Sequence, residues 1–242
     1  MTKPGHPTFW PTLLDARDAA PGVRVFRFSS PKGFSFIPGQ FLMFHFADDP
    51  KTWRAYSLCS SPVAAVEHFE VAVGMVGAFS ERLGRLEPRR EGGLVVRGPF
   101  GKWVYDGSVS HAVLVSGGTG ISPFRAMCLL KIEMGLAGRI TLCCSAKTVG
   151  GLLFRDEYGA WKKSGIGVNE RITQSEISTD WRGKIGRWTP AELCAAANDK
   201  TAMYYLCGPN KMVQDMREGL QAEGVPKDAI RTEKWGDYAD LI

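Results

Sequence analysis

One stretch of this chain constrains the fold more than any other, the sequence A-V-L-V-S-G-G-T-G-I-S-P at 112–123. The apolar run 113–115 is typical of a strand buried on both faces, as the strands of parallel sheets are. Three glycines follow, which permit a sharp bend and a close approach of the backbone to a ligand: Gly117, Gly118 and Gly120. Ser122 and Pro123 suit the cap and first turn of a helix that we expect to reach about Met134.

A helix that begins directly after a glycine turn is a potential anion site, because its free N–H groups and its dipole both favour a phosphate. The alternative is a tight strand–helix turn that binds nothing, and a glycine cluster alone does not separate the two. With 242 residues the chain has room for one large domain or for two of about 120 residues each. The choice therefore depends on the rest of the sequence.

Composition excludes several classes of protein. The sequence contains no apolar run of eighteen residues, and 1–11 lacks the apolar core of a signal peptide. The six cysteines show no C-x-x-C spacing, so the pattern supports neither a zinc site nor a cysteine-ligated iron–sulfur cluster. Reduced thiols in a cytoplasmic protein are the expectation. The net charge of +5 favours anionic cofactors or an acidic partner over nucleic acid.

The chain changes its pattern near residue 107. Before it, short strand patterns alternate with turns and one helical segment at 80–86; the expected strands are 23–28, 40–46, 55–60, 68–73 and 93–97. After it, strands alternate with helices, which indicates a parallel sheet. The expected strands are 113–115, 140–145, 169–173 and 202–207, and the helices 123–134, 152–163, 190–197 and 210–223. We predict an antiparallel β domain, either a barrel or a sandwich, at 1–107 and an α/β domain at 108–242.

Several short motifs carry potential chemistry. In the sequence R-A-Y-S at 54–57, Arg54 and Tyr56 point to the same side of a strand. A guanidinium, a phenol and the Ser57 hydroxyl together could hold a diphosphate, an aromatic ring and a ring nitrogen, although the same residues also suit a plain amphipathic strand. The motif C-G-P at 207–209 ends a second buried strand. Because ligands collect at the carboxyl ends of parallel strands, we expect it to lie beside the glycine turn.

Taken in order, the motifs R-A-Y-S, G-x-x-S, G-P-F-G, G-G-T-G-I-S-P, L-C-G-P-N-K-M-V and a late E-K-W resemble the ferredoxin–NADP(H) reductase family. The resemblance extends from Pro38 to Trp235. It implies an FAD-binding barrel followed by a pyridine-nucleotide domain. It also implies hydride exchange with NAD(P)H and single-electron exchange with a carrier protein.

On the FAD side, the resemblance implies that Arg54 pairs with the diphosphate of FAD and that Tyr56 packs on the flavin ring. Ser57 would form a hydrogen bond near flavin N5. Gly77 and Ser80 would hold the diphosphate from its other side.

On the nucleotide side, it implies that the glycine turn and the residues around it line the nicotinamide dinucleotide: Gly117, Gly118, Thr119, Gly120, Pro123, Gly208 and Pro209. Cys207 would lie against nicotinamide C4, with Glu233 beside it in a polar relay. Ser57, Cys207 and Glu233 are thus the expected catalytic residues. Trp235 falls where family members often place an aromatic ring over the flavin.

The chain departs from the family at the site for the 2′-phosphate of NADPH. Arginines are usual there, whereas this sequence has Lys147, the pair Thr173-Gln174, and Lys184 as a third candidate. Two cations remain, and we see no acid placed to bind a free ribose 2′-hydroxyl. The expectation is a preference for NADPH over NADH, weakened because one charge can tip such discrimination.

The predicted function is that of a cytoplasmic flavoprotein reductase. It would pass a hydride from NAD(P)H to FAD and then single electrons to a separate, acidic carrier of the ferredoxin or flavodoxin type. Alternatives are a free-flavin or ferric reductase, the reductase component of an oxygenase, and a non-catalytic nucleotide-binding assembly subunit. We expect no metal site, no nucleic-acid partner and no membrane span.

Overall fold

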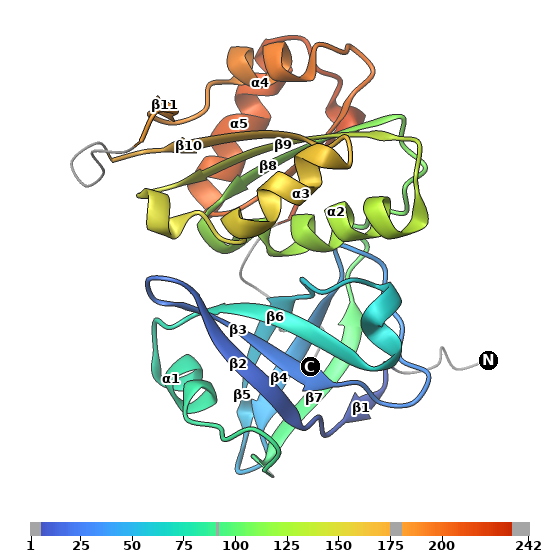
Figure 1. The fold of residues 1–242 in the computed structure, drawn as a ribbon, viewed down its shortest axis with the longest axis vertical. Coiled ribbons are helices and arrows are strands. Elements are labelled where there is room, and N and C mark those ends of the chain that lie inside the picture. The colour runs from blue at the N-terminus through green and yellow to red at the C-terminus, as the bar shows by residue number, and fades with distance from the viewer. Residues whose placement is uncertain (1–5, 91, 175–180, 234–242) are drawn as a thin grey trace.

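The computed structural model describes residues 6–90, 92–174 and 181–233. Two antiparallel sheets form the first half of the chain (Figure 1). The four-stranded sheet has the order β1 (Thr8–Phe9), β7 (Leu94–Phe100), β4 (Phe41–Phe46) and β5 (Asp49–Ser57). The three-stranded sheet has the order β2 (Leu13–Ala20), β3 (Val23–Ser29) and β6 (His68–Gly74).

A core rich in phenylalanine fills the space between these two sheets. Alternation along each strand sends every second side chain inward, and the fully buried rings are Phe26, Phe28, Phe44, Phe46 and Phe69. Helix α1 (Ala78–Gly84) follows β6 and contributes the buried Phe79 and Leu83 to the same core. The predicted antiparallel domain is confirmed.

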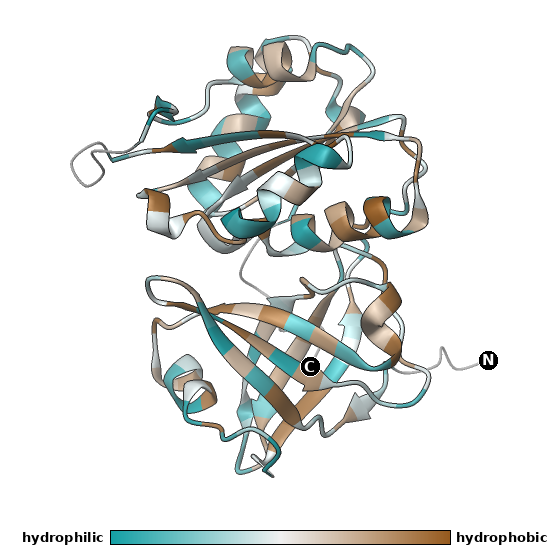
Figure 2. Ribbon diagram, viewed as in Figure 1, coloured by the Kyte–Doolittle hydropathy of each residue, from teal (hydrophilic) through white to brown (hydrophobic). Residues whose placement is uncertain are grey.

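The second half is a six-stranded parallel sheet with helices on both faces. Its order is β11 (Lys184–Ile185), β10 (Gly167–Ile172), β9 (Arg139–Ala146), β8 (His111–Gly117), β12 (Met203–Cys207) and β13 (Ile230–Thr232). Helices α2 (Ser122–Met134) and α3 (Tyr158–Lys163) cover the face toward the barrel, and α4 (Pro190–Ala197) and α5 (Asn210–Ala222) cover the other (Figure 1). The central strands are mostly apolar (Figure 2), as burial on both faces requires.

The order of strands places the predicted site. The chain proceeds from β8 to β9 and β10 on one side, and returns to β12 on the other side of β8. The carboxyl ends of β8 and β12 therefore flank the point where the order reverses, which is where open α/β sheets bind ligands. Cys207 pairs in register with Ser116, so the C-G-P motif does lie beside the glycine turn as predicted.

Some local predictions were wrong. The strand expected at 93–97 extends further along the chain, because Gly98 and Pro99 lie inside β7. Ser122 is the first residue of α2, whose cap is Ile121, and its hydroxyl donates to the Thr119 carbonyl. The strands β1, β2, β11 and β13 were not predicted. The boundary at residue 107 stays a prediction; the last barrel strand ends at Phe100 and the first parallel strand begins at His111. In the part of the chain that the structure describes, no helix is long and apolar enough to cross a membrane.

Candidate functional site

A cleft of about 1740 Å³ lies between the barrel and the parallel sheet. Its barrel wall comes from β5, the end of β6 and the start of α1. Its other wall comes from the glycine turn and the carboxyl ends of β9, β10 and β12. Pockets for a single small molecule usually have volumes of roughly 300–1000 Å³, so this cleft has room for more than one ligand.

The strand β5 supplies the barrel wall with the R-A-Y-S residues. Arg54, Tyr56 and Ser57 all line the cleft. The Tyr56 ring contacts Phe44 edge-on at 5.4 Å, and burial raises the pKa of its phenol to about 12. The Arg54 guanidinium donates to the Trp53 carbonyl at 2.8 Å, and no carboxylate among the described residues pairs with it. This wall thus offers an apolar ring beside a cation without a counter-ion.

The turn before α1 completes this wall. Gly77, the cap of α1, has an extended backbone, and a Cβ built on it would meet nothing within 4 Å. Ser80 lies in the first turn of this helix and is not its cap. Its hydroxyl accepts from the amides of Val76 and Gly77, both at 3.1 Å. The Ser80 hydroxyl therefore fixes the turn, and Ser80 also lines the cleft.

The glycine turn forms the opposite wall. Gly117, Gly118 and Thr119 line the cleft. Gly118 has a φ of 57°, which favours glycine, and nothing stands within 4 Å of the place of its missing side chain. A Cβ on Gly120 would collide with the Cys207 carbonyl, so glycine is needed there for the turn to pack on β12. The backbone is therefore open at Gly118, which lines the cleft, and closely packed at Gly120, which does not line it.

Three side chains from distant parts of the chain meet at the base of the cleft. Ser57 and Cys207 line it from opposite domains. The Cys207 thiol donates to Oε2 of Glu233 at 3.3 Å. Burial raises the pKa of Glu233 to about 7, although hydrogen bonds from Cys207 and Ser57 oppose the rise. The three residues predicted as catalytic are therefore gathered around one carboxyl that titrates near neutral pH.

The far end of the cleft lies over the ends of β9 and β10. Lys147, Thr173 and Gln174 line it as the sequence suggested. Lys184 does not line it, since its side chain is 73% exposed and lies 3.5 Å from the Glu192 carboxylate. Arg187 lines the cleft instead, and sequence reasoning missed it.

Arg187 is held at the cleft by an ion pair of which only the arginine is buried. The Arg171 side chain is 3% exposed and forms two hydrogen bonds with Glu192, at 2.9 and 3.0 Å. Arg171 also donates to the Arg187 carbonyl at 2.7 Å, and its guanidinium lies 3.6 Å from the centre of the Trp188 ring. Glu192 in turn caps α4 through Thr189. The G-R-W sequence before this capping box is the only signal that could have identified Arg187.

Five of the predicted site residues that the structure describes do not line the cleft but lie behind its wall or away from it: Gly120, Pro123, Gly208, Lys184 and Glu233. Pro209 lines it, and Glu233 lies behind Cys207. Trp235 lies outside the described residues, so its predicted place over the flavin stays a prediction.

Comparison with known proteins assigns both halves of the chain. Residues 12–105 match the family described as oxidoreductase FAD-binding domain, and residues 114–218 match the family described as oxidoreductase NAD-binding domain. Ferredoxin–NADP reductase B from Sorangium cellulosum is 31% identical, covering 92% of this chain and 96% of that protein. The reductase component of propane 2-monooxygenase from Mycolicibacterium goodii is 26% identical, covering 83% of this chain and 59% of its own.

A solved structure shows the same fold. The ferredoxin NADP⁺ reductase from Neisseria gonorrhoeae, with bound FAD and NADP, superposes with a TM-score of 0.78 at 20% identity, covering 93% of this chain and 98% of that one. The two matched domains, the shared fold and the sequence identity over nearly the full length all indicate one family. This chain belongs to the ferredoxin–NADP(H) reductase family, and it is a flavoprotein oxidoreductase that takes electrons from NAD(P)H through FAD.

Proposed function

We propose that FAD lies along the barrel wall and NAD(P)H along the opposite wall, with their reactive rings meeting at Ser57 and Cys207. The observation that carries this proposal is the convergence of Ser57 and Cys207, with Glu233 behind them, in a cleft that has room for more than one ligand. FAD, when bound, supplies an acceptor for hydride and can release two electrons one at a time. The residues of the protein bind and orient the two ligands and handle the proton.

The barrel wall suits FAD by its chemistry. A diphosphate requires a cation, and the Arg54 guanidinium lines the cleft with no carboxylate partner in the described residues. An isoalloxazine requires an apolar surface, which the half-buried Tyr56 ring offers. The open space beside the Gly77 backbone allows a phosphate to approach its amide. Gly77 and Ser80 would thus hold the diphosphate opposite Arg54.

The nucleotide wall suits a second dinucleotide. Gly117, Gly118 and Thr119 present backbone at the cleft, next to the start of α2 with Pro123 in its first turn. Pro209 lines the cleft beside them. Gly120 and Gly208 act from behind by letting the two turns pack closely. In this arrangement Cys207 contacts the nicotinamide end.

Glu233 would manage the proton at the base of the cleft. A carboxyl with a pKa of about 7 exists in both protonation states near neutral pH, so it can accept or release a proton without a large energetic cost. Its hydrogen-bond partners Cys207 and Ser57 both reach the cleft. Ser57 Oγ is then the atom that would exchange a proton near flavin N5.

We further propose that NADPH is preferred over NADH. Lys147 and Arg187 both line the far end of the cleft, and neither side chain has a carboxylate partner among the described residues. Two cations without counter-ions suit the 2′-phosphate. Thr173 and Gln174 would add neutral hydrogen bonds. Lys184, already paired with Glu192, is the weakest of the predicted contacts.

The proposed electron acceptor is a separate acidic carrier of the ferredoxin or flavodoxin type. The net charge of +5 and the identity with a ferredoxin–NADP reductase support it. The likeness to a monooxygenase reductase component supports the second candidate, a reductase that supplies an oxygenase. We propose the cytoplasm as the location, because none of the six cysteines forms a disulfide.

The test begins with purified protein under anaerobic conditions. We expect it to bind FAD, to lose its yellow colour with NADPH, and then to reduce a ferredoxin from the same host. Reduction of free flavin or ferric complexes but of no carrier protein would favour the free-flavin or ferric reductase. A protein that gains no flavin when incubated with FAD would leave only the nucleotide-binding subunit.

A further inference from the structure

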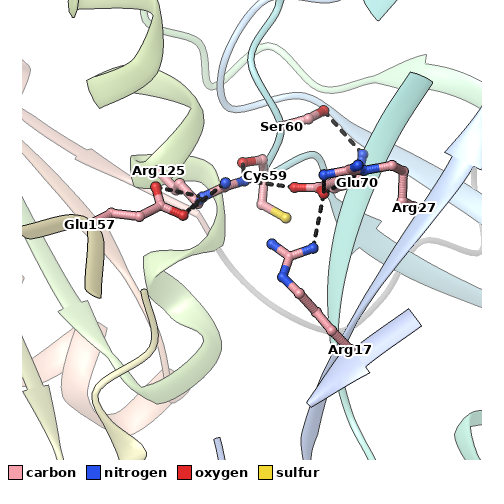
Figure 3. Close-up of polar contacts among 7 residues, drawn as sticks. All are labelled: Arg17, Arg27, Cys59, Ser60, Glu70, Arg125 and Glu157. Atoms are coloured by element: carbon pink, nitrogen blue, oxygen red, sulfur yellow. Dashed lines mark hydrogen bonds and ion pairs between the residues drawn. The ribbon is translucent and has the colours of Figure 1, made fainter. Parts of the chain in front are cut away.

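One cation joins the two domains outside the cleft. Arg125 lies on α2, and its side chain is only 11% exposed. Its Nη1 donates at 2.8 Å to the Cys59 carbonyl and at 2.8 Å to Oε2 of Glu70, both in the barrel domain. Its Nε donates at 2.8 and 3.0 Å to the two carboxylate oxygens of Glu157, in the nucleotide domain (Figure 3). A single guanidinium therefore bonds to both domains.

The barrel side of this contact is rigidly built. Glu70 is 2% exposed and also accepts hydrogen bonds from Arg17 at 3.0 Å and from Arg27 at 2.9 Å (Figure 3). Burial opposes its ionisation, but the hydrogen bonds and charges of the arginines win and lower the pKa of Glu70 to about 2. The Glu70 amide donates to the Ser60 hydroxyl at 3.0 Å. Glu70 is thus a fixed negative charge at working pH.

The contact lies close to both halves of the cleft along the chain. Cys59 comes two residues after Ser57 at the end of β5, and Arg125 comes three residues after Ser122, which lines the cleft at the start of α2. On α2, the neighbouring Phe124 is fully buried in an apolar cluster that includes barrel residues. Apolar packing has little directionality, whereas the planar guanidinium fixes the direction of each bond.

We propose that Arg125 is a positioning residue that sets the distance and angle between the flavin-binding and nicotinamide-binding walls. This inference rests on the proposed function. Transfer between two bound rings depends steeply on their alignment, and a misplacement of about 1 Å can cost on the order of 100-fold in rate. Each wall keeps its own binding residues when Arg125 changes. Loss of Arg125 should therefore disturb the alignment of the two ligands more than the affinity for either.

The decisive variant is Arg125→Lys. Lysine keeps the positive charge but replaces the fork of donors with one ammonium, which cannot hold the Cys59 carbonyl, Glu70 and Glu157 in the same geometry. Arg155→Lys is the matched control. Arg155 pairs with Glu170 at 2.9 Å, and both residues belong to the nucleotide domain, so this pair does not bridge the domains.

Four quantities separate positioning from general support: the FAD dissociation constant of the cofactor-free protein, the NADP⁺ dissociation constant, the long-wavelength charge-transfer absorbance of the loaded protein with nucleotide, and the stopped-flow rate of flavin reduction. For Arg125→Lys we expect both constants to stay within about twofold. The charge-transfer absorbance should fall, and the rate should fall about 10- to 100-fold. Arg155→Lys should match the wild type in all four.

Arg125→Lys with wild-type charge-transfer absorbance and rate would overturn the inference, as would a loss of rate explained wholly by weaker binding. If this variant does not fold, Arg125→Gln decides by the same four quantities, because it too removes the guanidinium that bonds to the Cys59 carbonyl and to Glu70. The lost alignment with retained binding supports the role, and wild-type values overturn it. Failure of the proposed function looks different, because then the wild-type protein itself binds no FAD or is not reduced by NADPH.

Discussion

Glu70 and Glu233 are both buried glutamates, 2% and 8% exposed, and their environments differ in one respect. Glu70 is surrounded by the guanidinium groups of Arg17, Arg27 and Arg125, and its pKa is about 2. Glu233 accepts hydrogen bonds from a thiol and a hydroxyl, and its pKa is about 7. Burial raises the pKa of both carboxyls, so the presence or absence of nearby cations accounts for the difference.

The comparison separates two uses of a buried charge. A carboxylate that is paired with several cations stays ionised and has a structural role, which for Glu70 is to connect the two domains. A carboxyl with neutral partners can change its protonation state near neutral pH and is suited to chemistry. The same distinction applies to cations, because a paired lysine or arginine supports the fold while one without a counter-ion is available to an anionic ligand.

The largest expected effect comes from removing the charge of Glu70. Glu70→Gln leaves three arginines facing each other without their carboxylate. Breaking a buried ion pair costs roughly 3–5 kcal/mol, and we expect the lower end, about 3 kcal/mol, because Arg17 and Arg27 are partly exposed to solvent. Urea denaturation of the cofactor-free protein measures it. Glu170→Gln, which breaks the more exposed pair with Arg155, should cost less than about 1 kcal/mol. Equal costs would remove the distinction between the two pairs.

Glu233 should make stability depend on pH in the opposite sense. Its pKa is raised in the folded protein, so the folded state keeps its proton up to about pH 7 while the unfolded chain releases it near the ordinary value of 4.5. Stability therefore falls as the pH rises from about 4.5 to about 7. A shift of this size corresponds to roughly 2–3 kcal/mol between about pH 5 and pH 7.5. The Glu70 contribution is already complete in that interval, since it is lost only as the pH falls from about 4.5 toward 2.

Urea denaturation of Glu233→Gln at the same two pH values isolates this contribution. The wild type should lose about 2–3 kcal/mol more than the variant on going to the higher pH. Equal losses of unfolding free energy in both proteins would mean that Glu233 is already ionised at about pH 5 in the folded state. Glu233 would then resemble Glu70, contrary to the comparison.

The same variant should also slow turnover. If Glu233 exchanges the proton that passes through Ser57, Glu233→Gln should lower kcat by about 100-fold at neutral pH, and the inflection near pH 7 in the pH–rate profile should disappear. FAD content should be unchanged, because Glu233 does not line the cleft. Ser57→Ala serves as the companion, with retained FAD and a similar loss of rate. A variant that keeps both turnover and the inflection would exclude Glu233 from the proton route.

The sequence predicted the parts of this molecule that local patterns and strand register determine. The apolar run before Gly117 predicted the central strand, and the rule for carboxyl ends of parallel strands brought Cys207 beside it. The resemblance of the motifs, and not spacing, suggested the roles of Arg54, Tyr56 and Ser57. Contacts between domains left no such signal. Glu70 and Arg125 are 55 residues apart, and nothing near either of them indicates the other.

The far end of the cleft shows a second reason why prediction stopped short. Lys184 and Arg187 are cations three residues apart; Lys184 begins the short strand β11, and Arg187 follows that strand. Which of them reaches the cleft depends on the path of the backbone between β11 and α4. That path is fixed by the bonds of Arg171 to Glu192 and to the Arg187 carbonyl, which are tertiary contacts.

The smallest expected effect tests the comparison on these two cations. Arg187 lines the cleft without a carboxylate partner in the described residues, whereas Lys184 is already paired with Glu192. A charge-assisted hydrogen bond to a phosphate is stronger than a neutral one, so Arg187→Gln should raise the KM for NADPH about tenfold and leave the KM for NADH within about twofold. Lys147→Gln should behave like Arg187→Gln. Lys184→Gln should change neither constant by more than about twofold, because Lys184 already pairs with Glu192 and its charge is screened by solvent.

Steady-state kinetics with both nucleotides at low ionic strength measures all three variants. If Lys184→Gln alone weakens NADPH, the paired cation would be the phosphate ligand after all, and pairing would not distinguish structural from ligand-binding charges in this protein.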